Sequence, residues 1–224
     1  MGPIYEILIA DDHPLFRSAL FQALSIGLDA DIKLTEAGSI AELQSLLEQR
    51  SAWDLVLLDL NMPGAHGFSG LVLLRSQYPH VPVIVISAQE EAAVVRRARD
   101  FGASGFIPKS SSLEAIQQSV QDVLNGDVCW PAQVNEDVTP LSMEQEAISA
   151  QLASLTPQQF RVLSMVCDGL LNKQIAYELN VSEATVKAHV TAIFRKLGVR
   201  TRTQAALALQ HMELAQSDRQ APQH

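Results

Sequence analysis

Cysteine is scarce in this chain of 224 residues, which contains only Cys129 and Cys167. The two lie 38 positions apart and form no CxxC motif or cluster with histidine. Disulfide-held domains and zinc sites need several such residues at short spacings. The sequence therefore excludes a disulfide framework and a cysteine-based zinc site, and it favours a reducing, cytoplasmic location.

Long hydrophobic runs are also missing. The longest unbroken apolar stretches, such as residues 55–58 and 205–209, are far shorter than the about 18 residues that a membrane span needs. No basic segment precedes an apolar stretch at the start of the sequence, as it would in a signal peptide. We therefore expect neither a membrane anchor nor a targeting segment.

Basic residues are outnumbered, with 16 Lys and Arg against 25 Asp and Glu and a formal net charge of −9. Such a total argues against DNA binding, because Lys and Arg contacts to phosphate dominate that affinity. The distribution changes this interpretation. Residues 1–130 carry 8 basic and 16 acidic side chains, residues 131–154 carry none and 4, and residues 155–224 carry 8 and 5. Only the last third is cationic.

Short aliphatic runs alternate with helical patterns over the first 125 residues. Three of the runs are continuously apolar, which is typical of strands buried on both faces. Five βα repeats predict a doubly wound α/β domain with a five-stranded parallel sheet. The expected strands are 4–10, 32–36, 54–60, 81–87 and 104–107, and the expected helices are 14–26, 39–49, 67–77, 90–101 and 111–125.

The pattern changes beyond the expected fifth helix. The segment PAQVNEDVTPLSMEQEAIS has two prolines, four acidic residues and no basic residue, as is typical of a linker, with a short helix near its end. Helical periodicity then continues to about residue 214. We predict a first domain at 1–128, a linker at 129–153, a small all-α domain at 154–214 and a disordered tail at 215–224.

Reactive side chains stand where the expected strands end. Asp11 and Asp12 follow the first strand, Asp59 follows the apolar run of the third, Ser87 ends the fourth and Lys109 follows the fifth. Parallel strands end at one edge of a sheet, so these side chains should lie together. Three carboxylates repel one another and favour a bound cation, and Mg²⁺ suits oxygen ligands and recruits phosphate oxygens. The hydroxyl and the ammonium complete a pocket for a phosphoryl group.

The segments ADDHPLFR, LVLLDLNMPG, VIVISA and GFIPKS resemble the receiver domain of bacterial two-component response regulators, over residues 4–125. The resemblance implies that Asp59 attacks the phosphohistidine of a sensor histidine kinase and becomes an aspartyl phosphate. It also implies that Asp11, Asp12, Asp59 and the backbone carbonyl of Asn61 hold Mg²⁺.

The same resemblance assigns three further residues to the phosphoryl group and the switch. Lys109 pairs with the phosphoryl oxygens, and Ser87 moves to hydrogen-bond them. Phe106 occupies the aromatic switch position, where the family more often has tyrosine. Phenylalanine keeps the packing role there and loses a hydroxyl contact.

Helix signals follow one another in the cationic third. Thr156, Pro157 and Gln159 predict a helix opened by a capping box. The sequence next predicts a short helix at 172–179, a tight turn at 180–181 and a helix from Ser182 to about residue 197. On the last helix one face is apolar, and the opposite face is small, polar and cationic, which suits entry into a major groove. Charge alone does not distinguish this face from any solvated one. The inward face carries Val186, Val190, Ile193, Phe194 and Leu197, and the outward face carries Ala184, Ala188, Thr191 and Arg195.

Residues 155–207, with the elements NKQIA, SEATVKAHV and KLGV, closely resemble the LuxR-type DNA-binding domain. Gln159 replaces the glutamate usual there, which keeps the capping geometry without the charge. The resemblance implies that residues 203–213 form the helix through which these domains pair on DNA. It implies base contacts by Lys187, Ala188 and Thr191 and phosphate contacts by Asn172, Lys173, Thr185 and Arg195.

Both resemblances together predict a NarL/FixJ-type response regulator. Such a protein is not an enzyme but a phosphorylation-controlled transcription factor, which binds double-stranded promoter DNA as a homodimer when active. In the inactive state we expect the receiver to mask the recognition or the pairing helix. One alternative is a phosphate-independent DNA-binding protein with a relic receiver. Another is a Mg²⁺-dependent phosphohydrolase, which is disfavoured because Asp11 and Asp12 are adjacent and Asp59 stands alone, without a DxDx[TV] loop.

Overall fold

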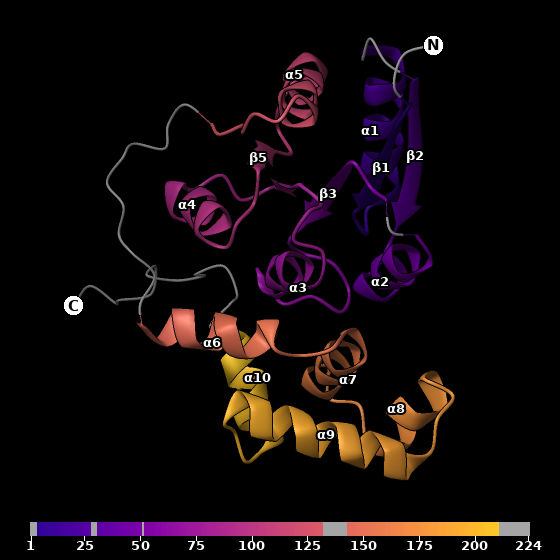
Figure 1. Ribbon diagram of the computed structural model, residues 1–224, viewed down its shortest axis with the longest axis vertical. Coiled ribbons are helices and arrows are strands. Elements are labelled where there is room, and N and C mark those ends of the chain that lie inside the picture. The colour runs from indigo at the N-terminus through magenta and orange to yellow at the C-terminus, as the bar shows by residue number, and fades with distance from the viewer. Residues whose placement is uncertain (1–3, 28–30, 51, 132–142, 211–224) are drawn as a thin grey trace, which may run out of the picture.

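A parallel five-stranded sheet forms the centre of the N-terminal half (Figure 1). Its order is β2-β1-β3-β4-β5, so the order reverses at β1 and leaves a crevice at the carboxyl ends of β1 and β3. The computed structural model describes residues 4–27, 31–50, 52–131 and 143–210. The strands are β1 (Ile4–Ala10), β2 (Asp31–Ala37), β3 (Leu55–Asp59), β4 (Val83–Ser87) and β5 (Gly105–Pro108).

Helices cover both faces of the sheet because alternate strand residues point to opposite sides. Leu55 and Leu57 pack in one buried cluster with side chains of α1 and α5, whereas Val56 and Leu58 pack in another with side chains of α2, α3 and α4. The predicted doubly wound α/β class is confirmed. The helices are α1 (Pro14–Gly27), α2 (Ile40–Gln49), α3 (Ser69–Gln77), α4 (Ala92–Asp100) and α5 (Leu113–Leu124).

The main differences from the expected elements lie at their ends. Strand β4 begins at Val83 rather than at residue 81, after Pro82, which has no N–H to donate. Helices α3 and α4 each begin two residues later than expected, at Ser69 and Ala92. Neither has a side chain that caps its first turn, so the sequence carries no strong start signal there.

The chain returns to the sheet after α5 and lies along β5. The Phe106 N–H donates to the Cys129 carbonyl at 2.9 Å, and the Cys129 N–H donates to the Ser104 carbonyl at 3.2 Å. Gly105 permits this approach, because an added Cβ would lie 2.8 Å from the Cys129 carbonyl oxygen. Cys129, which we expected in the linker, therefore packs against the first domain.

Helices alone make up the described part of the C-terminal half. The predicted capping box is confirmed: the Gln159 N–H donates to Thr156 Oγ1 at 3.3 Å, and the Thr156 N–H donates to Gln159 Oε1 at 3.1 Å. Residues 211–214 and the expected tail lie outside the described residues. No described helix has the length and apolar character to cross a membrane. The helices are α6 (Met143–Ala153), α7 (Pro157–Cys167), α8 (Asn172–Glu178), α9 (Glu183–Leu197) and α10 (Arg202–Gln210).

Candidate functional site

Two carboxylates meet at the crevice of the sheet. Asp11 follows β1 and Asp59 ends β3, and these neighbouring strands run in register, with Ala10 opposite Leu58. Both side chains are almost fully buried, at 2% and 1% exposure. Burial raises the pKa of Asp59, and the hydrogen bond from Lys109 only partly offsets this rise. The sequence therefore places a desolvated carboxylate where a cation or a phosphoryl group can meet it.

Lys109 binds both of these carboxylates. Its Nζ lies 2.7 Å from Asp11 Oδ2 and 2.9 Å from Asp59 Oδ2. Burial lowers the pKa of Lys109, but its hydrogen bonds to Asp11 and Asp59 outweigh that effect, so the pKa is raised and the ammonium stays charged. The ring of Phe16 lies below this ammonium, with its centroid 4.9 Å away.

Asp12 and His13 complete the acidic side of the pocket. Ligand atoms of Asp11, Asp12, His13 and Asp59 all lie within 4.8 Å of one another. Asp12 Oδ1 is buried and accepts no hydrogen bond, although His13 Nδ1 is 2.7 Å away. A buried carboxylate oxygen without a hydrogen bond is suited to a metal ion, and three carboxylates are the hard ligands that Mg²⁺ prefers. The residues thus fit the expected ion.

The remaining predicted pocket residues lie on the same edge of the sheet. Ser87 ends β4, between β3 and β5, and its buried hydroxyl accepts from the Gln89 N–H at 3.1 Å. Phe106 is buried on β5, opposite Val85 of β4. The Asn61 N–H donates to Asp59 Oδ1 at 3.2 Å, which turns the loop after β3 back over the carboxylate.

An open cavity of about 640 Å³ gives access to Asp59. His13 and Phe16 line it, although the sequence interpretation assigned them no role. His13 was identifiable, because it directly follows Asp12. Phe16 was not, because only the folding of α1 places its ring beneath the Lys109 ammonium. The lining residues are His13, Leu15, Phe16, Ala19, Asp59, Asn61, Ala88 and Lys109.

A second candidate site is the outer face of α9. Ser182 caps this helix by accepting from the Thr185 N–H at 3.1 Å, and Gly198 ends it with a φ of 65°. Val186, Ile193 and Leu197 are buried on the inner side. The residues that we expected to face DNA from this helix, Lys187, Ala188, Thr191, Thr185 and Arg195, are all exposed.

Contacts on this outer face are local. Lys187 Nζ lies 3.3 Å from Glu183 Oε1, and the Thr191 hydroxyl donates to the Lys187 carbonyl at 2.9 Å. Lys173 on α8 is exposed, whereas Asn172 is half-buried and its Oδ1 accepts from Arg202 of α10. Helix α9 lies beyond α6 and α7 from the sheet (Figure 1), and the side chains expected to read bases are exposed, so the N-terminal half does not mask the recognition helix in this conformation.

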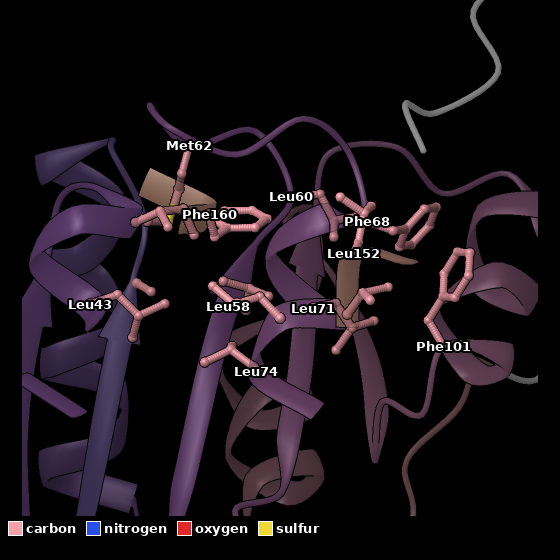
Figure 2. Close-up of a cluster of buried hydrophobic side chains, with 14 of the residues drawn as sticks. Leu43, Leu58, Leu60, Met62, Phe68, Leu71, Leu74, Phe101, Leu152 and Phe160 are labelled. Atoms are coloured by element: carbon pink, nitrogen blue, oxygen red, sulfur yellow. The ribbon is translucent and has the colours of Figure 1, made fainter. Parts of the chain in front are cut away.

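The two halves instead meet through α6 and α7. Helix α6, expected only as a short helix in the linker, packs along α3, and α7 packs against α2 and α3 (Figure 1). Leu152 and Phe160 of these helices share one buried cluster with Met62 and Phe68 of the N-terminal half (Figure 2). This cluster is continuous with the core of the sheet, and no sequence pattern indicates it.

Three polar contacts accompany this shared cluster. The buried Ser164 hydroxyl on α7 donates to the Gly64 carbonyl at 2.7 Å, and Gln77 Nε2 donates to the Leu155 carbonyl at 2.9 Å. His66 Nε2 lies 3.6 Å from Asp168 Oδ1. Gly64 and His66 belong to the β3–α3 loop (residues 60–68), which directly follows Asp59. The loop that begins at the pocket therefore also contacts the C-terminal half.

Comparisons with known proteins agree with this division. Residues 7–121 match the model of the response regulator receiver domain, and residues 153–209 match the model of the luxR family of bacterial regulatory proteins. The chain is similar to a glycerol metabolism activator of Pseudomonas putida, with 41% identity over 92% of this chain and 95% of the relative. It is 32% identical to the nitrate/nitrite response regulator protein NarP of Escherichia coli (strain K12), over 91% and 93% of the two chains.

Among solved structures, the fold is similar to RcsB from Salmonella enterica serovar Typhimurium, solved bound to a promoter in the presence of the phosphomimetic BeF3−. The TM-score is 0.51 at 23% sequence identity, and the match covers 92% of this chain and 98% of that one.

Proposed function

Because this chain belongs to the NarL/FixJ type of response regulators, with a receiver domain followed by a LuxR-type DNA-binding domain, we propose that phosphorylation of Asp59 controls its binding to promoter DNA. The observation that carries the proposal is the meeting of Asp11, Asp59 and Lys109, which come from three different strand ends. An ion pair with a purely structural role needs only one carboxylate for its lysine. A phosphoryl site instead needs the ammonium beside a reactive carboxylate, together with further acidic side chains that can hold a metal ion.

The chemistry is transfer of a phosphoryl group from a sensor histidine kinase. An Asp59 oxygen attacks the phosphorus of a phosphohistidine whose other ring nitrogen is protonated; the P–O bond forms as the P–N bond breaks, and the ring leaves as neutral imidazole, keeping that proton. Lys109 stabilises the negative charge of the transferred group. Asp11, Asp12, Asp59 and the Asn61 carbonyl would hold Mg²⁺, which when bound neutralises charge on the phosphoryl oxygens.

We infer that the new aspartyl phosphate acts on its surroundings in two directions. Ser87 donates its hydroxyl to the phosphoryl group instead of holding Gln89, and Phe106 repacks behind it. The β3–α3 loop, which follows the modified residue and contacts α7 through the Gly64 carbonyl, supplies a second route. Release of α6 and α7 from the receiver domain would then free the C-terminal domain to pair with that of another protomer. This route does not require the recognition helix to be masked.

DNA recognition is assigned to α8 and α9. We propose that Lys187, Ala188 and Thr191 contact base edges in the major groove, and their shared position on the exposed face of α9 supports this. Asn172, Lys173, Thr185 and Arg195 surround that face and are proposed phosphate contacts. One small domain makes few such contacts, so binding as a homodimer through α10 would supply the remaining affinity.

The test compares the full-length protein with its Asp59→Asn variant, using phosphoramidate and Mg²⁺ as donor and metal. The wild type should gain the mass of one phosphoryl group, form dimers by light scattering and bind a duplex spanning two half-sites at least about tenfold more tightly. The variant should show none of these changes. Asp127→Asn removes an exposed carboxylate of the same domain and is the matched control.

Two other outcomes would replace the proposal. If Asp59→Asn dimerises and binds DNA as the wild type does under the same treatment, the receiver is a relic and DNA binding is independent of phosphate. If the wild type releases phosphate from p-nitrophenyl phosphate over many turnovers and Asp59→Asn does not, the pocket belongs to a phosphohydrolase.

A further inference from the structure

Arg202, the first residue of α10, joins this helix to α8. Its Nη1 donates to the Leu170 carbonyl at 2.6 Å, and its Nη2 donates to Asn172 Oδ1. Both contacts are partly buried, and they span 32 and 30 positions of the sequence. The guanidinium of Arg202 thus links two helices with different expected roles. It belongs to α10, which we expect to pair protomers, and it holds the start of α8, which we expect to lie on DNA.

The contact fixes which way the Asn172 side chain presents its amide. A guanidinium has only donors, so the amide must turn its oxygen toward Arg202. The planar amide then carries Nδ2, with its two N–H donors, on the side away from Arg202. A phosphate oxygen accepts hydrogen bonds only, so this orientation suits a phosphate contact and the reverse orientation does not.

The position of Arg202 is itself fixed by packing. Ala205 and Leu209, three and seven residues further along α10, are buried, and α10 packs closely on α7 and α9. Arg202 therefore lies on the inner side of α10, continuous with the core. Leu207 is 51% exposed and remains available for a partner protomer.

We propose that Arg202 is a positioning residue for DNA binding, which orients the Asn172 amide so that it donates to a phosphate. This inference rests on the proposed function, because it assumes that α8 lies on DNA. Lysine is a poor substitute for arginine in this role, because its side chain lacks the rigid planar fork whose two nitrogens donate separately to the Leu170 carbonyl and to Asn172.

The experiment measures equilibrium binding of full-length protein, treated with phosphoramidate and Mg²⁺, to a mixed-sequence DNA duplex. The variants are Asn172→Ala, Arg202→Met, Arg202→Lys and the double variant Asn172→Ala/Arg202→Met. Arg200→Met is the matched control, because it removes an exposed charge two positions away. Thermal unfolding of each variant reports on structural damage separately from binding.

Asn172→Ala should weaken binding by about tenfold, the value of a hydrogen bond to a charged group. Arg202→Met and Arg202→Lys should weaken it about as much, and more than Arg200→Met. The double variant should bind no more weakly than either single variant, because both remove the same contact. Effects that add in the double variant, or wild-type binding by Arg202→Lys, would overturn the proposal. Failure of the wild type itself to bind the duplex would instead contradict the proposed function.

Discussion

The two halves of this molecule present their functional side chains in opposite ways. The receiver places Asp11, Asp59 and Lys109 inside, where they depend on one another for charge balance. The DNA-binding half places Lys187 and Thr191 outside, where they are exposed and contact only their own helix. Buried charges are strongly coupled, and exposed ones act almost independently. The same substitution should therefore have very different effects in the two halves.

The largest expected difference compares one lysine from each half. Lys109→Met should lower the free energy of unfolding by about 3 kcal/mol, because it leaves two buried carboxylates without their cation. Lys187→Met should change it by no more than about 0.5 kcal/mol, since its ion pair with Glu183 is exposed. Urea unfolding of both variants measures this, and equal effects would show that the carboxylates are not desolvated.

The second prediction concerns base recognition by the exposed face. Lys187→Ala and Thr191→Ala should each reduce discrimination between an operator and scrambled DNA by about 1–3 kcal/mol if they contact bases. Neither should alter phosphorylation, since α9 packs mainly on α6, α7, α8 and α10 rather than on the strands that carry the pocket. Binding titrations on both duplexes check this. An equal loss on the two duplexes would reassign the residue to a phosphate contact.

A third prediction addresses the contact between the halves. Ser164→Ala removes the donor to the Gly64 carbonyl and should cost about 1 kcal/mol of stability. If the interface restrains the DNA-binding domain, the unphosphorylated variant should also bind DNA up to about fivefold more tightly. Ser76→Ala is the control, because its hydroxyl donates within α3 to the Leu73 carbonyl. DNA binding that Ser164→Ala leaves unchanged would argue against this route of control.

The smallest expected effect concerns the reactivity of the two cysteine thiols, Cys129 in the receiver half and Cys167 in the DNA-binding half. Burial raises the pKa of Cys129 to about 11 and that of Cys167 to about 12. At pH 8 both thiols are therefore protonated and should react slowly with iodoacetamide. Since the halves share one core cluster, both labelling rates should rise over the same range of urea. Labelling of Cys167 well before Cys129 would show that the C-terminal half opens alone.

The contrast between the halves extends to how far the amino-acid sequence predicts each of them. Buried parallel strands have a continuous apolar signature, so the residues at their ends, such as Asp59 and Lys109, can be placed together from the sequence alone. The outer face of α9 follows from helical period, but its role needs the family resemblance. Contacts such as Ser164 with Gly64 and Arg202 with Asn172 join surfaces distant in sequence. No period or motif marks such pairs, because each depends on how two finished elements pack.

The segment that returns along β5 also bears on self-association. An edge strand exposes unpaired N–H and C=O groups to which another chain can add a strand. Here Cys129 takes up the Phe106 N–H and the Ser104 carbonyl, so the outer side of β5 is already hydrogen-bonded there. The close approach that Gly105 permits thus protects this edge of the receiver from strand-by-strand aggregation.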